Sequence, residues 1–71
     1  MQQLYAKIKK NSKYFGQNQM AKMEGNFPFP VTITGDHDPE RYFVKGGPGG
    51  QYRLSDVNLF VKLKGVEIRI R

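Results

Sequence analysis

Residues 27–34 have the sequence FPFPVTIT, in which every second residue is apolar. A period of two is typical of a β-strand with one buried face. Because proline cannot donate to a sheet, we expect residues 27–30 to be extended or at a sheet edge, with pairing beginning near Val31. Phe27 and Phe29 are expected to fill the core, and the alternative is an exposed strand that a partner extends by β-augmentation.

The same period continues on both sides of this stretch. Apolar residues alternate in residues 4–8, 41–45, 51–54, 57–63 and 66–70. The phase breaks at Ser55-Asp56, which predicts a turn or bulge there. Lys64-Gly65 predicts a tight hairpin. Residues 46–50, Gly-Gly-Pro-Gly-Gly, predict a hairpin loop that is the most mobile internal segment.

Residues 17–24 fit either a strand or one helical turn. Met, Ala, Lys and Glu favour a helix, but the run is too short to be a stable helix alone. We favour a strand, because residues 2–9 otherwise lack a hairpin partner.

These elements predict an all-β fold in a single small domain, residues 1–71. Five or six short antiparallel strands would curl into a small barrel, since a flat sheet would leave one face wet. An SH3-like barrel is preferred over an OB-like one, because an OB-fold usually places a helix between its third and fourth strands. The residues expected to be buried are Phe29, Val31, Ile33, Leu59, Val61, Ile68 and Ile70.

Composition excludes several classes of protein. The chain has 71 residues and no cysteine, so disulfides and Cys-based zinc sites are excluded. No apolar run is long enough to span a membrane, and the first residues lack a signal-peptide core, so we expect a cytoplasmic protein without a membrane partner.

Catalytic and metal-binding residues are not apparent. His37, the one histidine, lies between Asp36 and Asp38, where a turn is the simpler interpretation than a metal site. No nucleophile is paired with a base, so we expect neither an enzyme nor a cofactor.

Charge is the strongest functional signal. The net charge is +6, and it is distributed in blocks: residues 1–23 hold five lysines and no acid, and residues 24–40 hold four acids and no Lys or Arg. Residues 41–71 hold seven basic residues and two acids. This pattern predicts one acidic loop on an otherwise basic domain, and a basic domain favours an acidic partner such as nucleic acid.

Strand phase predicts where the basic residues lie. If the apolar residues of the terminal strands face the core, one outward surface combines cations with aromatic rings, which suits DNA or RNA. Its members are Tyr5, Lys7, Lys9, Phe60, Lys62, Arg69 and Arg71. Reversing Lys9 or Arg69 is expected to weaken binding more than reversing Lys22 or Lys45.

Two other interpretations of these residues remain open. The domain could be a protein-interaction module that docks a peptide or an acidic protein surface. The cations could also serve only solubility and the protection of strand edges.

Overall fold

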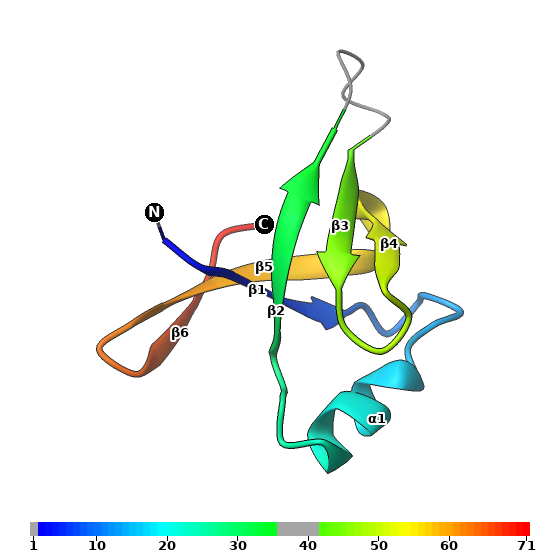
Figure 1. The fold of residues 1–71 in the computed structure, drawn as a ribbon, viewed down its shortest axis with the longest axis horizontal. Helices are drawn as coiled ribbons and strands as arrows, with labels where there is room; N and C mark the ends of the chain where they lie inside the picture. Colours follow the sequence, from blue (N-terminus) through cyan, green and yellow to red (C-terminus); the bar gives the residue numbers. More distant parts are fainter. Residues whose placement is uncertain (1, 36–41) are drawn as a thin grey trace.

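The computed structural model describes residues 2–35 and 42–71 and is mostly β (Figure 1). The strands are β1 (Leu4–Ile8), β2 (Phe29–Thr34), β3 (Phe43–Gly46), β4 (Gln51–Arg53), β5 (Val57–Leu63) and β6 (Val66–Arg69). Helix α1 (Gln17–Met23) follows β1, and a 3₁₀ turn, η2 (Leu54–Asp56), joins β4 to β5.

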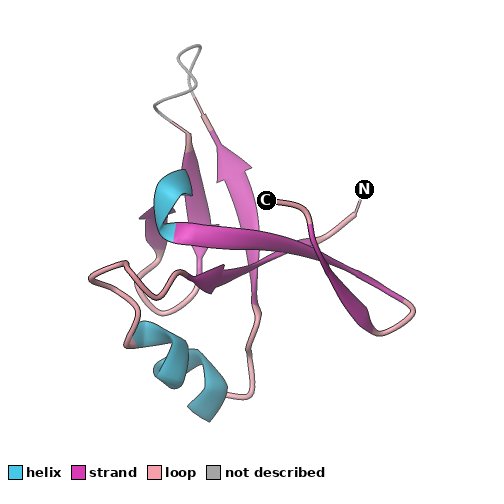
Figure 2. Cartoon of the chain, turned by 180° about the vertical axis from the view of Figure 1, so that it is seen from behind, coloured by secondary structure: helices cyan, strands magenta, loops and turns pink. Residues whose placement is uncertain are grey.

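All six strands form one antiparallel sheet in the order β4-β3-β2-β1-β5-β6. The predicted antiparallel β fold is therefore confirmed at this level. The predicted barrel is wrong, because β4 and β6 are the two ends of an open sheet and do not pair with each other. The β5–β6 hairpin instead extends away from β3, β4 and the helix (Figure 2).

The core lies on one face of the sheet, around the crossing of β1 with β2 and β5. Ala6 pairs with Phe29 on one side and Leu59 on the other, and all three side chains are buried. The other buried apolar residues are Ile8, Ala21, Val31, Val44, Tyr52 and Val57. Burial of Phe29, Val31 and Leu59 was predicted from strand phase and is confirmed.

Other predicted core residues are exposed. Ile33, Ile68 and Ile70 are 39%, 41% and 53% exposed, and Val61 is only partly buried. Their phase is as expected, since Ile33 pairs with buried Val44 and Ile68 pairs with Val61. The prediction fails because strand phase determines the face of the sheet, whereas burial also requires something to cover that face.

Helix α1 replaces the strand that we favoured for residues 17–24. Ala21 packs into the core, and the Asn18 side chain bonds both backbone groups of Ile8: Nδ2 donates to Ile8 O and Ile8 N donates to Oδ1, each at 3.0 Å. Asn18 thereby takes the place of a neighbouring strand where β2 no longer pairs with β1. The expected hairpin partner was unnecessary, because β1 pairs with β2 and β5.

The FPFP stretch enters the middle of the sheet instead of its edge. Pairing with β1 begins at Phe29, two residues earlier than expected. Pro30 faces Tyr5 of β1, while β3 pairs with β2 only from Val31 onward. The nitrogen of Pro30 points toward the β3 side, so its missing N–H removes no pairing bond.

The predicted connections are largely confirmed. Lys64 and Gly65, with φ of 51° and 81°, form the tight β5–β6 turn. The 3₁₀ turn η2 lies at the predicted phase break, and residues 46–50 join β3 to β4. The predicted turn around His37 lies outside the described residues.

Candidate functional site

Three neighbouring strands bring aromatic and basic side chains together on the face opposite the core. Tyr5 of β1 pairs with Phe60 of β5, which pairs with Arg69 of β6, so these three residues form a row across the sheet. Lys7 and Lys62 lie two residues from this row on the same face, because side chains alternate along a strand. We call Tyr5, Lys7, Phe60, Lys62 and Arg69 the basic face.

The lysines of the basic face lie over aromatic rings. Lys62 Nζ is 4.3 Å from the centroid of the Tyr5 ring, and Lys7 Nζ is 4.7 Å from that of Phe60. Such contacts contribute about 0.5–1 kcal/mol each at exposed sites. These contacts hold each ammonium group next to an aromatic ring, so that a cation and a ring lie within 4.7 Å of each other.

Two residues that the sequence did not assign to this face adjoin it. Phe27 lies between Lys7 and Lys22, with Nζ-to-centroid distances of 5.5 Å and 4.9 Å. Phe27 packs only partly against the core. Because Phe27 alternates with Phe29, it was predicted to be a core residue. No sequence signal indicated that its ring also contacts Lys7 and Lys22. Lys22 is consequently a poor off-site control for charge reversal.

One acidic side chain reduces the positive charge of the basic face. Glu67 Oε1 lies 2.8 Å from Lys7 Nζ, and both side chains are about one-third exposed. Such a pair contributes about 0–1 kcal/mol. Arg69 donates from Nη2 to Asn58 Oδ1 at 3.0 Å, which orients the guanidinium along β5. Three cations and one acid on the outer sides of β1, β5 and β6 leave a positive surface.

Lys9 and Arg71 lie in a different environment from the other predicted binding residues. They line a cavity of about 540 Å³ next to η2, together with Tyr42, Arg53 and Ser55. A bulge explains the departure of Arg71 from the expected alternation: Leu59 O accepts from both Ile70 N (2.8 Å) and Arg71 N (3.4 Å). The sequence did not predict this bulge, because Ile70 and Arg71 continue the apolar–basic alternation without interruption.

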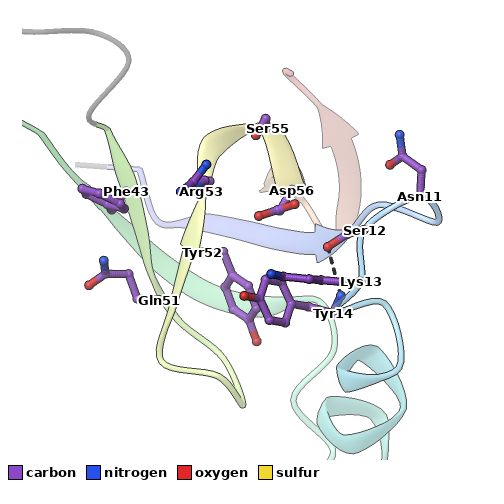
Figure 3. Close-up of a pocket in the computed structure, with 10 residues that line it drawn as sticks. All are labelled: Asn11, Ser12, Lys13, Tyr14, Phe43, Gln51, Tyr52, Arg53, Ser55 and Asp56. Atoms are coloured by element: carbon purple, nitrogen blue, oxygen red, sulfur yellow. Dashed lines mark hydrogen bonds between the residues drawn. The ribbon is translucent and has the colours of Figure 1, made fainter.

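A second cavity, of about 600 Å³, lies between the loop after β1 and the β4–η2 segment (Figure 3). Tyr14 and Tyr52 meet there edge to face, with ring centroids 6.0 Å apart. Lys13, Arg53 and Asp56 add charged groups to its wall. Sequence reasoning missed this cavity, because its lining comes from segments about 40 residues apart in the chain.

The Tyr52 hydroxyl is held at the base of this region. It accepts from Gly49 N at 2.8 Å and donates to Gln17 Oε1. Burial raises the pKa of Tyr52 above its ordinary value, and the bond from Gly49 lowers it by a smaller amount. Tyr52 therefore stays protonated and connects the β3–β4 hairpin to α1.

In the part of the chain that the structure describes, no group of three or more His, Cys, Asp or Glu side chains is arranged to hold a metal ion. Within the same ranges, no helix is long and apolar enough to cross a membrane.

Comparison with known proteins gives no assignment: no family model matches the chain, and no curated protein or solved structure shows significant similarity to it.

Proposed function

We propose that this protein is a small, non-enzymatic nucleic-acid-binding factor of the cytoplasm and that it binds DNA or RNA through the basic face. The observation that carries the proposal is the row Tyr5–Phe60–Arg69, flanked by the ring-contacting Lys7 and Lys62. Cations neutralise phosphates, and exposed rings stack on bases. A surface that combines the two at strand spacing suits a flexible single strand.

Single strands are the preferred substrate within this proposal. A duplex buries its bases, so the rings of Tyr5 and Phe60 would gain little from it. In a single strand the bases can leave the backbone and stack, while the phosphates reach the ammonium groups beside the rings. The ring–ammonium distances of 4.3 Å and 4.7 Å place both kinds of contact within one nucleotide.

An SH3-like topology remains our preferred finer description of the fold. The helix lies between the first and second strands, not between the third and fourth. An OB-fold usually has its helix between the third and fourth strands, so the position of α1 does not favour the OB-like alternative. This preference carries no function by itself.

The test is binding of the full chain to labelled single-stranded and duplex oligonucleotides across a salt series. If Lys7, Lys62 and Arg69 each engage a phosphate, the log–log slope on a single strand should be about −2. Lys62→Glu should weaken binding at least about fivefold more than Lys45→Glu, because both lysines are exposed strand residues but only Lys62 belongs to the basic face. Equal losses would indicate diffuse attraction, and absence of binding at low salt would show the proposal to be wrong.

The cavity of about 600 Å³ favours a second candidate, a module that docks a peptide. Its wall offers the ring of Tyr14, which packs on buried Tyr52, for apolar or proline side chains, and Lys13 and Arg53 for acidic ones. If the ligand is a peptide in this cavity, substitution of Tyr14 should weaken its binding, and Lys62→Glu should leave its affinity unchanged. Nucleic-acid binding predicts the reverse pattern.

A further inference from the structure

Strand β6 is an edge strand with one apolar side, on which Val66 and Ile68 lie, and one charged side, on which Glu67 and Arg69 lie. It is the last strand in the sheet order, and all four of its residues are exposed. Val66 is 60% exposed, and Ile68 and Ile70 lie on the same side of the chain, also exposed. Leu63, across the turn, is exposed as well. Natural proteins usually cover, charge or distort such an edge, because its free backbone groups and apolar side chains invite another strand.

The backbone groups that point away from the sheet can be assigned. Ile70 N donates to Leu59 O on β5 at 2.8 Å. Because alternate residues of an antiparallel strand point the same way, Ile68 and Val66 also bond to β5. The N–H and C=O groups of Glu67 and Arg69 therefore point outward from the sheet edge.

The sequence of this edge is complementary to itself. Residues 66–70 are Val-Glu-Ile-Arg-Ile. If two copies pair antiparallel about Ile68, the acid at 67 of each copy faces the base at 69 of the other. The apolar residues then face one another: Ile68 meets the Ile68 of the second copy, and Val66 comes next to Ile70, which lies at the bulge just beyond the end of β6. Opposite charges across paired strands stabilise them, and like charges destabilise them.

The hydrogen-bond pattern fits the same register. With the two-fold axis at Ile68, the Glu67 and Arg69 positions of the two copies face each other as hydrogen-bonded pairs, and these are the residues whose backbone groups point outward. Ile68 falls in a non-hydrogen-bonded pair, where side chains approach most closely. Charge, apolar pattern and backbone direction thus select one register.

We infer that the chain forms a symmetric dimer in which β6 pairs antiparallel with β6 of a second copy about Ile68. The two open sheets join into one, and the interface is isologous, as in most homodimers. The apolar pair Val61–Ile68 continues into the same pair of the second copy. The contact of Glu67 Oε1 with Lys7 persists beside it, since that side chain remains 38% exposed.

The inference does not rest on the proposed function, although both involve Arg69, and it is tested without nucleic acid. Sedimentation velocity of the full chain over a concentration series should show a species of twice the 8.2 kDa chain mass. Glu67→Arg alone or Arg69→Glu alone creates two like-charge pairs per dimer and should raise the dissociation constant about tenfold. An equimolar mixture of these two variants should recover the dimer, because each supplies the charges that the other lacks. Lys45→Glu, on β3, is the control and should leave the dissociation constant unchanged.

Disulfide capture tests the register. The chain has no cysteine, so Ile68→Cys introduces a single thiol at the two-fold axis, where paired Cα atoms lie about 4.5 Å apart and can be bridged. Val66→Cys is the matched control on the same face of β6. In the inferred register its two copies lie about 13 Å apart, beyond disulfide reach. Mild oxidation should therefore crosslink the first variant rapidly and the second poorly.

Two results would overturn the inference. One is a wild-type chain that remains at the monomer mass at about 1 mM, a concentration at which even a weak strand pair should be populated. The other is a dimer whose dissociation constant is unchanged by the charge reversals, or that crosslinks equally through positions 66 and 68. The first result would mean that β6 does not pair with a second copy, and the second would mean that the dimer forms through another surface or in another register.

Discussion

At the scale of single residues, Asn18 has a structural role in the core that no sequence motif predicted. Its buried amide bonds both backbone groups of Ile8, so Asn18→Ala would leave a donor and an acceptor unsatisfied in the core. We expect a loss of about 2–4 kcal/mol in the free energy of unfolding, measured by urea denaturation. Gln19→Ala, at the next, exposed position of α1, is the control and should cost less than about 0.5 kcal/mol. Similar losses from both variants would contradict this role.

Tyr52 predicts a pH dependence of stability. Burial raises the pKa of the folded-state hydroxyl above the ordinary value of 10.0. The stability that this group contributes is therefore fully present below the unfolded pKa and is lost as pH rises through the folded pKa. Tyr52→Phe lacks the hydroxyl and should be less stable than the wild type at pH 8, by about 1 kcal/mol, because Gly49 N–H and Gln17 lose a partner.

The stability difference between wild type and Tyr52→Phe should narrow as the pH rises above the ordinary pKa of tyrosine and through the raised pKa of folded Tyr52. Urea midpoints of both proteins at each pH give this difference. The comparison is needed because pH effects that the two proteins share cancel in the difference. A constant difference would show that the hydroxyl does not titrate with unfolding.

At the scale of elements, one glycine in the loop of residues 46–50 lies against the core, and another does not. Gly47 has a φ of 74°, and a Cβ there would lie 2.7 Å from two carbons of the buried Phe29 ring. Gly50 has a φ of 81° but open space around it. Gly50→Ala should therefore cost only backbone strain, about 1–2 kcal/mol, whereas Gly47→Ala adds overpacking of about 1–3 kcal/mol. Thermal denaturation of the two variants checks this order, and a Gly47→Ala variant as stable as Gly50→Ala would contradict it.

Strand periods and turns were predictable from the sequence, whereas the helix was not. Alternation placed Phe29, Val31 and Leu59 correctly in the core because the face on which they lie is covered there: they belong to the buried cluster that includes Ala21 of α1. Helix α1 has only seven residues, and it is stabilised by Asn18 and by tertiary packing, which local propensity cannot reveal. Ile68 was placed on the right face, but the sequence does not reveal whether that face is covered.

At the scale of the whole molecule, strand phase and strand order determine the candidate site together. Phase predicted that Tyr5, Lys7, Phe60, Lys62 and Arg69 face away from the core. Their assembly into one surface required β1, β5 and β6 to be neighbours, and the pairings provide this. Lys9 and Arg71 line a cavity next to η2 instead, because a bulge at the end of β6 and the turn at η2 interrupt the regular sheet. Irregularities of this kind leave little trace in a periodic sequence.

The basic face, as a whole surface, predicts that phosphate and base contacts are separable. Lys62→Gln should reduce the magnitude of the single-strand salt slope by about 0.7, because one released counterion is lost. Tyr5→Leu should leave the slope unchanged but weaken single-strand binding by about 1–3 kcal/mol, with a smaller effect on duplex, because it removes a stacking surface and no charge. Matched controls are Lys45→Gln and Tyr42→Leu, which change an exposed lysine and an exposed tyrosine outside the face.

Fluorescence anisotropy with labelled oligonucleotides at four or more salt concentrations gives both the slope and the affinity. If Tyr42→Leu weakened single-strand binding as much as Tyr5→Leu, the rings of the face would not be the stacking surface. If Lys45→Gln changed the salt slope as much as Lys62→Gln, the phosphates would be bound by the overall positive charge and not by the basic face. The two distances that join Lys62 to Tyr5 and Lys7 to Phe60 are the structural reason to expect otherwise, because they fix each cation beside a ring on one surface.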